Sequence, residues 1–113
     1  EYASLLNNLG KLKYLSGQAR EAIPMLEQAA VIFSNEVGKE SMEYATVIFN
    51  QGVAWTMLKS VKAKDLLTEA SKIRQKKFGD AHPKFGEATA RLALYEWMMN
   101  NPKGAQDHFK TTF

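Results

Sequence analysis

The sequence Tyr-Ala-Thr-Val-Ile-Phe-Asn-Gln-Gly at residues 44–52 echoes an earlier one, Tyr-Ala-Ser-Leu-Leu-Asn-Asn-Leu-Gly at residues 2–10. Four residues recur at one constant offset, and the pairs are Tyr2 and Tyr44, Ala3 and Ala45, Asn8 and Asn50, and Gly10 and Gly52. A fixed period of roughly 20–50 residues is the signature of a repeat protein. The stretch therefore predicts a chain built from stacked copies of one structural unit.

The repetition extends into the second half of each unit, where the offset is shorter by one. Ala22, Leu26, Ala29, Ile32 and Gly38 correspond in this way to Ala63, Leu67, Ala70, Ile73 and Gly79. The turn inside the second unit is therefore one residue shorter than the turn inside the first. Small residues recur where two helices would have to cross closely; they are Gly10, Gly52, Ala93, Ala22, Ala63 and Ala105.

The spacing of apolar residues predicts helices and shows no strand alternation. We expect six helices, over residues 2–15, 19–36, 43–58, 60–78, 84–99 and from Lys103 onward. In the first helix the expected apolar face consists of Leu5, Leu6, Leu9, Leu12 and Leu15. Gly17 suits a turn with positive φ, Ser41 suits a helix N-cap, and Pro24 predicts a bend in the second helix.

Composition bounds the class of protein without identifying a partner. The chain has 113 residues, no cysteine, a hydrophobic fraction of 45% and a net charge of +3. This is about one domain with ordinary globular composition and no disulfides, and its charge is too mild to indicate nucleic acid or membrane. The chain starts at Glu1 without a methionine and has no membrane-spanning apolar run. We expect a fragment of a longer, cytoplasmic protein.

The three units in phase resemble the tetratricopeptide repeat, in the long-period version of kinesin light chains. The resemblance rests on residues 6–10, 21–24, 44–52, 79–83 and 92–95, together with Gly17, Ala63 and Ala105. Lys13 and Glu96 depart from the family pattern, and the second turn lacks the family's glycine. The resemblance implies a right-handed α-solenoid with repeats over about residues 2–38, 43–79 and 83–113. It also implies a non-catalytic module that holds a peptide or partner protein in a concave groove.

The family's concave positions, carried over to this sequence, give the candidate groove residues. They are Ser4, Asn7, Lys11 and Tyr14 in unit one, Thr46, Phe49, Asn50, Val53 and Met57 in unit two, and Glu87, Ala90, Arg91, Leu94 and Trp97 in unit three. We expect Asn7 and Asn50 to bond a peptide backbone, because a carboxamide both donates and accepts hydrogen bonds. We expect Phe49, Met57 and Trp97 to hold an apolar anchor, and Lys11 and Arg91 to meet an acidic group. The alternative is that the aromatic and apolar residues are core.

The family's carboxylate clamp, which grips acidic C-terminal tails, fits this sequence poorly. It needs a lysine followed by an asparagine on the first helix, whereas Asn7 precedes Lys11 here. Asn50 and Arg91 match the clamp pattern. Glu87, however, replaces a lysine and would repel a carboxylate.

No catalytic or metal-binding pattern is present in the sequence. His82 lies in a loop, and His108 and Asp107 are adjacent on a helix and do not share a face. We therefore expect no enzyme activity, no cofactor and no metal site. The fourth helix carries the cations Lys62, Lys64, Lys72, Arg74, Lys76 and Lys77, expected on a solvated convex face. Two alternatives to the binding module stay open: a structural or self-associating segment, and a regulatory part of a larger protein.

Overall fold

The computed structural model describes residues 2–79 and 83–100, and this part of the chain is helical with no strand. The helices are α1 (Tyr2–Leu15), α2 (Ala19–Glu36), α3 (Met42–Met57), α4 (Lys62–Phe78) and α5 (Pro83–Asn100). The predicted all-α fold is confirmed, and each described helix begins and ends within two residues of its expected position. The expected sixth helix and both histidines lie outside the described residues.

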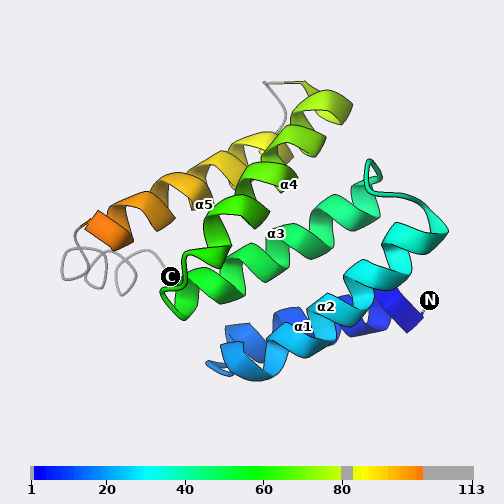
Figure 1. The fold of residues 1–113 in the computed structure, drawn as a ribbon, viewed down its shortest axis with the longest axis horizontal. Coiled ribbons are helices and arrows are strands. Elements are labelled where there is room, and N and C mark those ends of the chain that lie inside the picture. Colours follow the sequence, from blue (N-terminus) through cyan, green and yellow to red (C-terminus); the bar gives the residue numbers. More distant parts are fainter. Residues whose placement is uncertain (1, 80–82, 101–113) are drawn as a thin grey trace.

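The helices form successive hairpins that stack side by side (Figure 1). α1 pairs with α2 and α3 with α4, while α2 packs on α3 and α4 packs on α5. Smaller contacts join α1 to α3 and α3 to α5, so the first helix of each hairpin lies on a common side. This is the helical-repeat solenoid that the sequence predicts, and it gives α1, α3 and α5 one shared inner surface.

Capping follows the predicted residues in two of the turns. Gly17 has a φ of 85°, and the hydroxyl of Ser41 accepts a hydrogen bond of 3.1 Å from the backbone N–H of Tyr44. In the turn between α3 and α4, which lacks the family's glycine, Lys59 takes the left-handed conformation with a φ of 57°. The missing glycine therefore leaves the turn intact, at the steric cost of a side chain in this region. Pro24 lies inside α2 without ending it.

Close helix crossing depends on the two glycines of the repeated stretch. A Cβ placed on Gly10 would lie 2.6 Å from Cδ2 of Leu26, and one on Gly52 would lie 2.7 Å from Cδ2 of Leu67. Leu26 and Leu67 are fully buried in the hairpins α1–α2 and α3–α4. The packing role that the sequence predicts for these small residues therefore agrees with the geometry.

The expected apolar face of the first helix is wrong. Among its five leucines only Leu6 is buried, and the other four are between 38% and 65% exposed. The residues of α1 that are buried are Ala3, Leu6, Gly10 and Tyr14. α1 packs mainly on α2, and the stripe of Leu5, Leu9 and Leu12 points away from that contact. We call these three residues the leucine stripe.

Candidate binding groove on the inner surface

Two adjoining cavities lie where α1 and α3 face the inner surface. The first, which we call the basic pocket, has a volume of about 220 Å³ and is lined by Asn7, Asn8, Lys11, Tyr14, Leu15, Thr46, Phe49, Asn50, Arg74, Glu87 and Arg91. The second, which we call the acidic pocket, has a volume of about 330 Å³ and is lined by Ser4, Asn7, Asn8, Phe33, Met42, Glu43 and Thr46. Asn7, Asn8 and Thr46 line both. The two pockets therefore form one groove.

A buried arginine forms part of the wall of the basic pocket. Arg74 of α4 is only 1% exposed, and its guanidinium carbon lies 4.4 Å from the centre of the Phe49 ring. Its Nη1 donates to Oε1 of Glu87 on α5 at 3.3 Å. Burial lowers the pKa of Arg74, and the Glu87 carboxylate opposes that shift. The cation thus contacts a carboxylate and an aromatic face, an arrangement that guanidinium groups favour.

A chain of hydrogen bonds crosses from α1 to α3 beneath the groove. The Tyr14 hydroxyl donates to Oδ1 of Asn50 at 2.9 Å, and Nδ2 of Asn50 donates to Oδ1 of Asn7 at 2.9 Å. Asn50 is only 3% exposed. Its carboxamide therefore serves the protein's own network, and Asn7 is the amide that remains partly exposed at the surface of the groove.

Tyr14 stays neutral in this network. Burial raises the pKa of Tyr14 to about 12, while the nearby Arg91 cation lowers it and Glu87 raises it. Burial in turn lowers the pKa of Arg91, and electrostatic interactions with the Tyr14 hydroxyl and the Glu87 carboxylate oppose this shift. Among the described residues that line the basic pocket, Lys11, Arg74 and Arg91 thus give three cations against the one carboxylate of Glu87. The pocket suits an anionic group.

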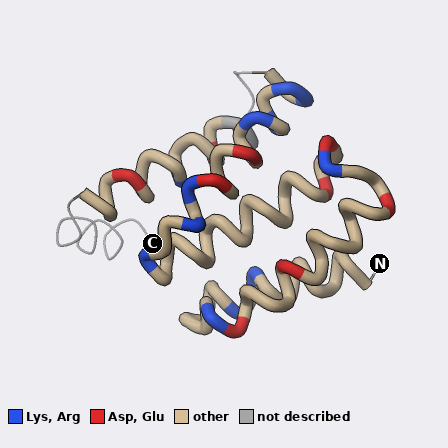
Figure 2. The backbone as a smooth tube through the Cα atoms, viewed as in Figure 1, with Lys and Arg blue, Asp and Glu red and all other residues tan. Residues whose placement is uncertain are grey.

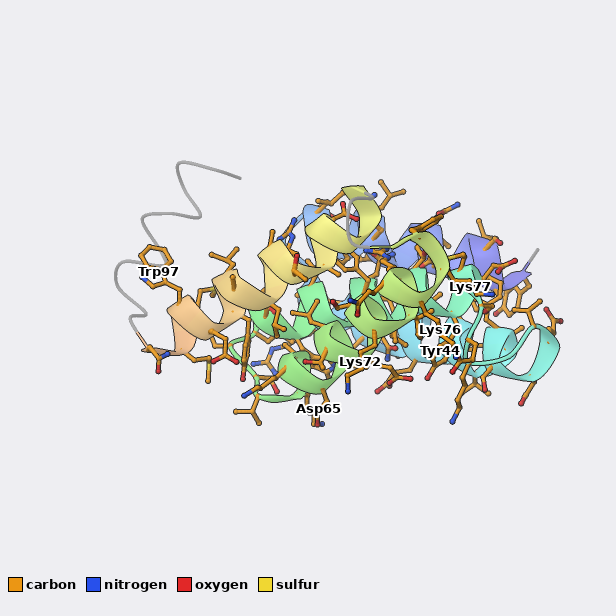
Figure 3. The ribbon with its side chains drawn as sticks, turned by 90° about the horizontal axis from the view of Figure 1, so that it is seen from above. Tyr44, Asp65, Lys72, Lys76, Lys77 and Trp97 are labelled. Atoms are coloured by element: carbon orange, nitrogen blue, oxygen red, sulfur yellow. The ribbon has the colours of Figure 1, made fainter. Side chains whose placement is uncertain are left out.

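Six of the ten residues singled out from the sequence line the basic pocket: Asn7, Lys11, Tyr14, Phe49, Asn50 and Arg91. The other four, Val53, Met57, Leu94 and Trp97, line neither pocket. Val53 is buried, and Leu94 is buried beside Met98. Met57 and Trp97 are each 39% exposed, and Figure 3 shows Trp97 projecting near one end of α5. Of the three residues expected to hold an apolar anchor, Phe49 lines the basic pocket beside the charged groups, whereas Met57 and Trp97 do not.

Sequence reasoning misses the most buried cation of the pocket. The sequence pattern places Arg74 on the solvated face of α4, and this expectation is wrong. The residue follows Ala63, Leu67 and Ala70 at helical spacing, and all three are fully buried. An arginine that continues an apolar stripe is the signal that could have identified it.

The five lysines of α4 are exposed as expected, and they are interspersed with acidic residues (Figure 2). Asp65 and Lys72 project from the same outer side of α4 (Figure 3). This surface is mixed in sign and does not form a basic stripe. In the part of the chain that the structure describes, no group of three His, Asp or Glu residues could hold a metal ion. None of the helices described there is both long and apolar enough to cross a membrane.

Comparison with known proteins agrees with this architecture. A family model described as tetratricopeptide repeat matches residues 1–76, which is more than half of the chain. No curated protein and no solved structure gives a significant match. Repeats of this family generally mediate protein–protein interaction, and the family is typically non-catalytic. The repeated stretch, the stacked hairpins and the family match agree, and the chain belongs to the tetratricopeptide repeat family.

Proposed function

We propose that this chain is a non-catalytic adaptor that holds an extended segment of a partner protein along the groove, with an acidic group in the basic pocket. The observation that carries the proposal is the charge of that pocket, where the described lining residues are charged at Lys11, Arg74, Arg91 and Glu87. Because Arg74 is buried and Arg91 is partly buried, water screens the charge of these two residues less than it screens that of an exposed cation. Charge-assisted hydrogen bonds are strong in such a setting.

The shape of the groove favours a peptide over a compact ligand. Both pockets belong to one surface that runs along α1 and α3. Asn7 lies between them and keeps donor capacity after it accepts from Asn50. Its amide can therefore bond the backbone of a segment that lies across the groove.

Glu87 does not exclude an acidic ligand in this arrangement. Its carboxylate is engaged with Arg74, and its side chain is half exposed. The sequence predicts that Glu87 would repel a ligand carboxylate. This repulsion is reduced because Glu87 is paired with the buried Arg74, which the sequence pattern places on the outer surface. The clamp pattern of the family is still incomplete, so the proposal concerns an acidic group of a peptide and does not depend on that clamp.

A peptide-display selection tests the proposal, with wild type beside Lys11→Glu. Lys11 is exposed, so the substitution reverses a charge of the pocket without burying anything. Lys72→Glu is the matched control, since it makes the same charge change on the outer side of α4. We expect acidic peptides to be enriched by wild type and by Lys72→Glu and lost with Lys11→Glu. A folded wild type that enriches no peptide, or equal enrichment by both variants, would contradict the proposal.

Self-association is the second candidate function, and the leucine stripe favours it. Leu5, Leu9 and Leu12 have the spacing of three and four residues that pairs helices along one seam, and all are exposed. Light scattering over a range of concentrations tests this candidate. A mass that rises with concentration in wild type and stays monomeric in Leu9→Glu would support it, whereas a wild type that is monomeric throughout would exclude it.

A further inference from the structure

We propose that the acidic pocket is a second subsite that takes a lysine or arginine side chain of the bound segment. The proposal rests on the function proposed above and names the charge pattern of its ligand. The segment would carry one cationic and one acidic residue about three positions apart. Two features of the groove support this pattern: the chemistry of the acidic pocket and the distance between the pockets.

The acidic pocket combines a carboxylate with an apolar wall. Glu43 is exposed in the first turn of α3, and it takes part in none of the ion pairs found among the described residues. Phe33 and Met42 supply apolar surface beside it. Lysine and arginine lay their methylene stems on apolar surface and keep the charged group at its edge. This combination therefore fits a long cationic side chain better than it fits a short polar one.

The position of Glu43 at a helix N-terminus works partly against a cation. The backbone of that first turn carries a partial positive charge of about half a unit. The carboxylate that lines the pocket carries a full negative charge, so the net field there attracts cations. Ser4 and Asn8 of α1 also line this pocket and can accept hydrogen bonds from the ammonium or guanidinium group.

The distance between the pockets sets the spacing in the ligand. Ser4 lines the acidic pocket and Lys11 lines the basic pocket. These residues are seven positions apart on α1, which corresponds to about 10 Å at 1.5 Å per residue. An extended or polyproline II segment advances about 3.1–3.4 Å per residue. About three residues therefore span the two pockets, and the predicted pattern is a cation and an acid separated by two residues.

Fluorescence anisotropy with synthetic peptides tests this pattern. One pair of peptides carries Arg-Ala-Ala-Glu and Glu-Ala-Ala-Arg, so that both chain directions are sampled. Two further peptides replace the arginine of each by alanine. A fifth separates the charged residues by six positions. We expect the better of the first two to bind wild type about five-fold more tightly than its alanine partner, the factor for an exposed charge pair worth about 1 kcal/mol. The fifth peptide should bind wild type about five-fold more weakly than the better of the first two.

Glu43→Gln is the decisive variant, and Glu27→Gln on α2, exposed and outside both pockets, is its control. We expect Glu43→Gln to abolish the five-fold preference and leave the affinity for the alanine peptide unchanged. Glu27→Gln should keep the preference. If the arginine and alanine peptides bind wild type equally while Lys11→Glu weakens both, the second subsite is wrong and the basic pocket stands. If no peptide binds the folded wild type, both proposals fail.

Discussion

α1 and α3 carry the same repeated sequence pattern, yet α3 buries one face more than α1 does. The leucine stripe of α1 corresponds to Val47, Gln51 and Ala54 of α3. These three residues of α3 are at most 7% exposed, whereas the stripe is at least 38% exposed. α3 packs between α2 and α4, but α1 packs mainly on α2. The neighbour of a helix therefore decides which of its faces is buried, even when the repeated pattern is shared.

The two hairpins agree closely where their own helices meet. Gly10 lies against Leu26 as Gly52 lies against Leu67. In the first turn the N–H of Gln18 donates to the carbonyl of Lys13 at 2.8 Å, and in the second the N–H of Ser60 donates to that of Trp55 at 3.0 Å. The contacts within a hairpin are thus reproduced, while the contacts between hairpins differ.

The one-residue difference between the turns is absorbed at the start of the second helix. In the first hairpin the N–H of Ala22 bonds the carbonyl of Gln18, four residues back. In the second, the corresponding Ala63 bonds Ser60, three residues back. A tighter first turn of the 3₁₀ type therefore replaces an α-helical one, which lets the packed faces keep their alignment.

The largest effect is expected from charges placed at corresponding positions of the two helices. Val47→Asp puts an unpaired carboxylate at a fully buried site, and we expect it to lower the free energy of unfolding by about 4 kcal/mol or more. Leu5→Asp should change it by less than about 0.5 kcal/mol, because Leu5 is exposed. Urea denaturation followed by circular dichroism measures both. Equal losses would mean that the leucine stripe is covered in solution.

Alkaline pH should destabilise the contact between α1 and α3. Because the pKa of Tyr14 is raised to about 12 in the folded chain, its contribution is complete below pH 10 and is lost as pH rises toward 12. The two-unit shift corresponds to roughly 2–3 kcal/mol. We expect the free energy of unfolding to fall more steeply in wild type than in Tyr14→Phe over this range. Parallel pH profiles would show that Tyr14 does not titrate as described.

Substituting alanine for Gly10 and for Gly52 should destabilise the chain by different amounts. Gly52→Ala forces Leu67 to move inside a hairpin with neighbours on both sides, and we expect a loss of about 1–3 kcal/mol. Gly10→Ala should cost less, because α1 packs mainly on α2 and can shift outward, while the gain in helix propensity of about 1 kcal/mol is the same at both sites. Thermal unfolding of the two variants gives the comparison. A larger loss at Gly10 would contradict it.

The smallest effect is expected from exchanging residues at the two turns. Lys59→Gly removes a side chain from a left-handed position and should stabilise the chain by about 0.5–1 kcal/mol. Gly17→Lys makes the opposite change at the corresponding position and should destabilise it by a similar amount. Chemical denaturation resolves this difference. If both substitutions act in the same direction, the two turns are not equivalent.

The hairpins could be predicted from the sequence because local periodicity, turn residues and the repeated glycines all act within a single hairpin. The groove could be predicted only in part. Lys11 and Arg91 follow from their repeat positions, but the place of Arg74 depends on Phe49 and Glu87, which come from two other helices. The exposure of the leucine stripe likewise depends on what packs beside α1. Contacts between helices, within and between units, thus decided which expectations from the sequence were wrong.

The most direct test of the proposed groove is an NMR titration of the labelled chain with an acidic peptide that it binds. The two exposed surfaces of α1, the groove and the leucine stripe, report separately through their backbone amides. We predict chemical-shift changes at Asn7, Lys11 and Thr46 and along the facing part of α5, with little change along the leucine stripe. Changes concentrated on the leucine stripe, with the groove residues unmoved, would contradict the proposed groove.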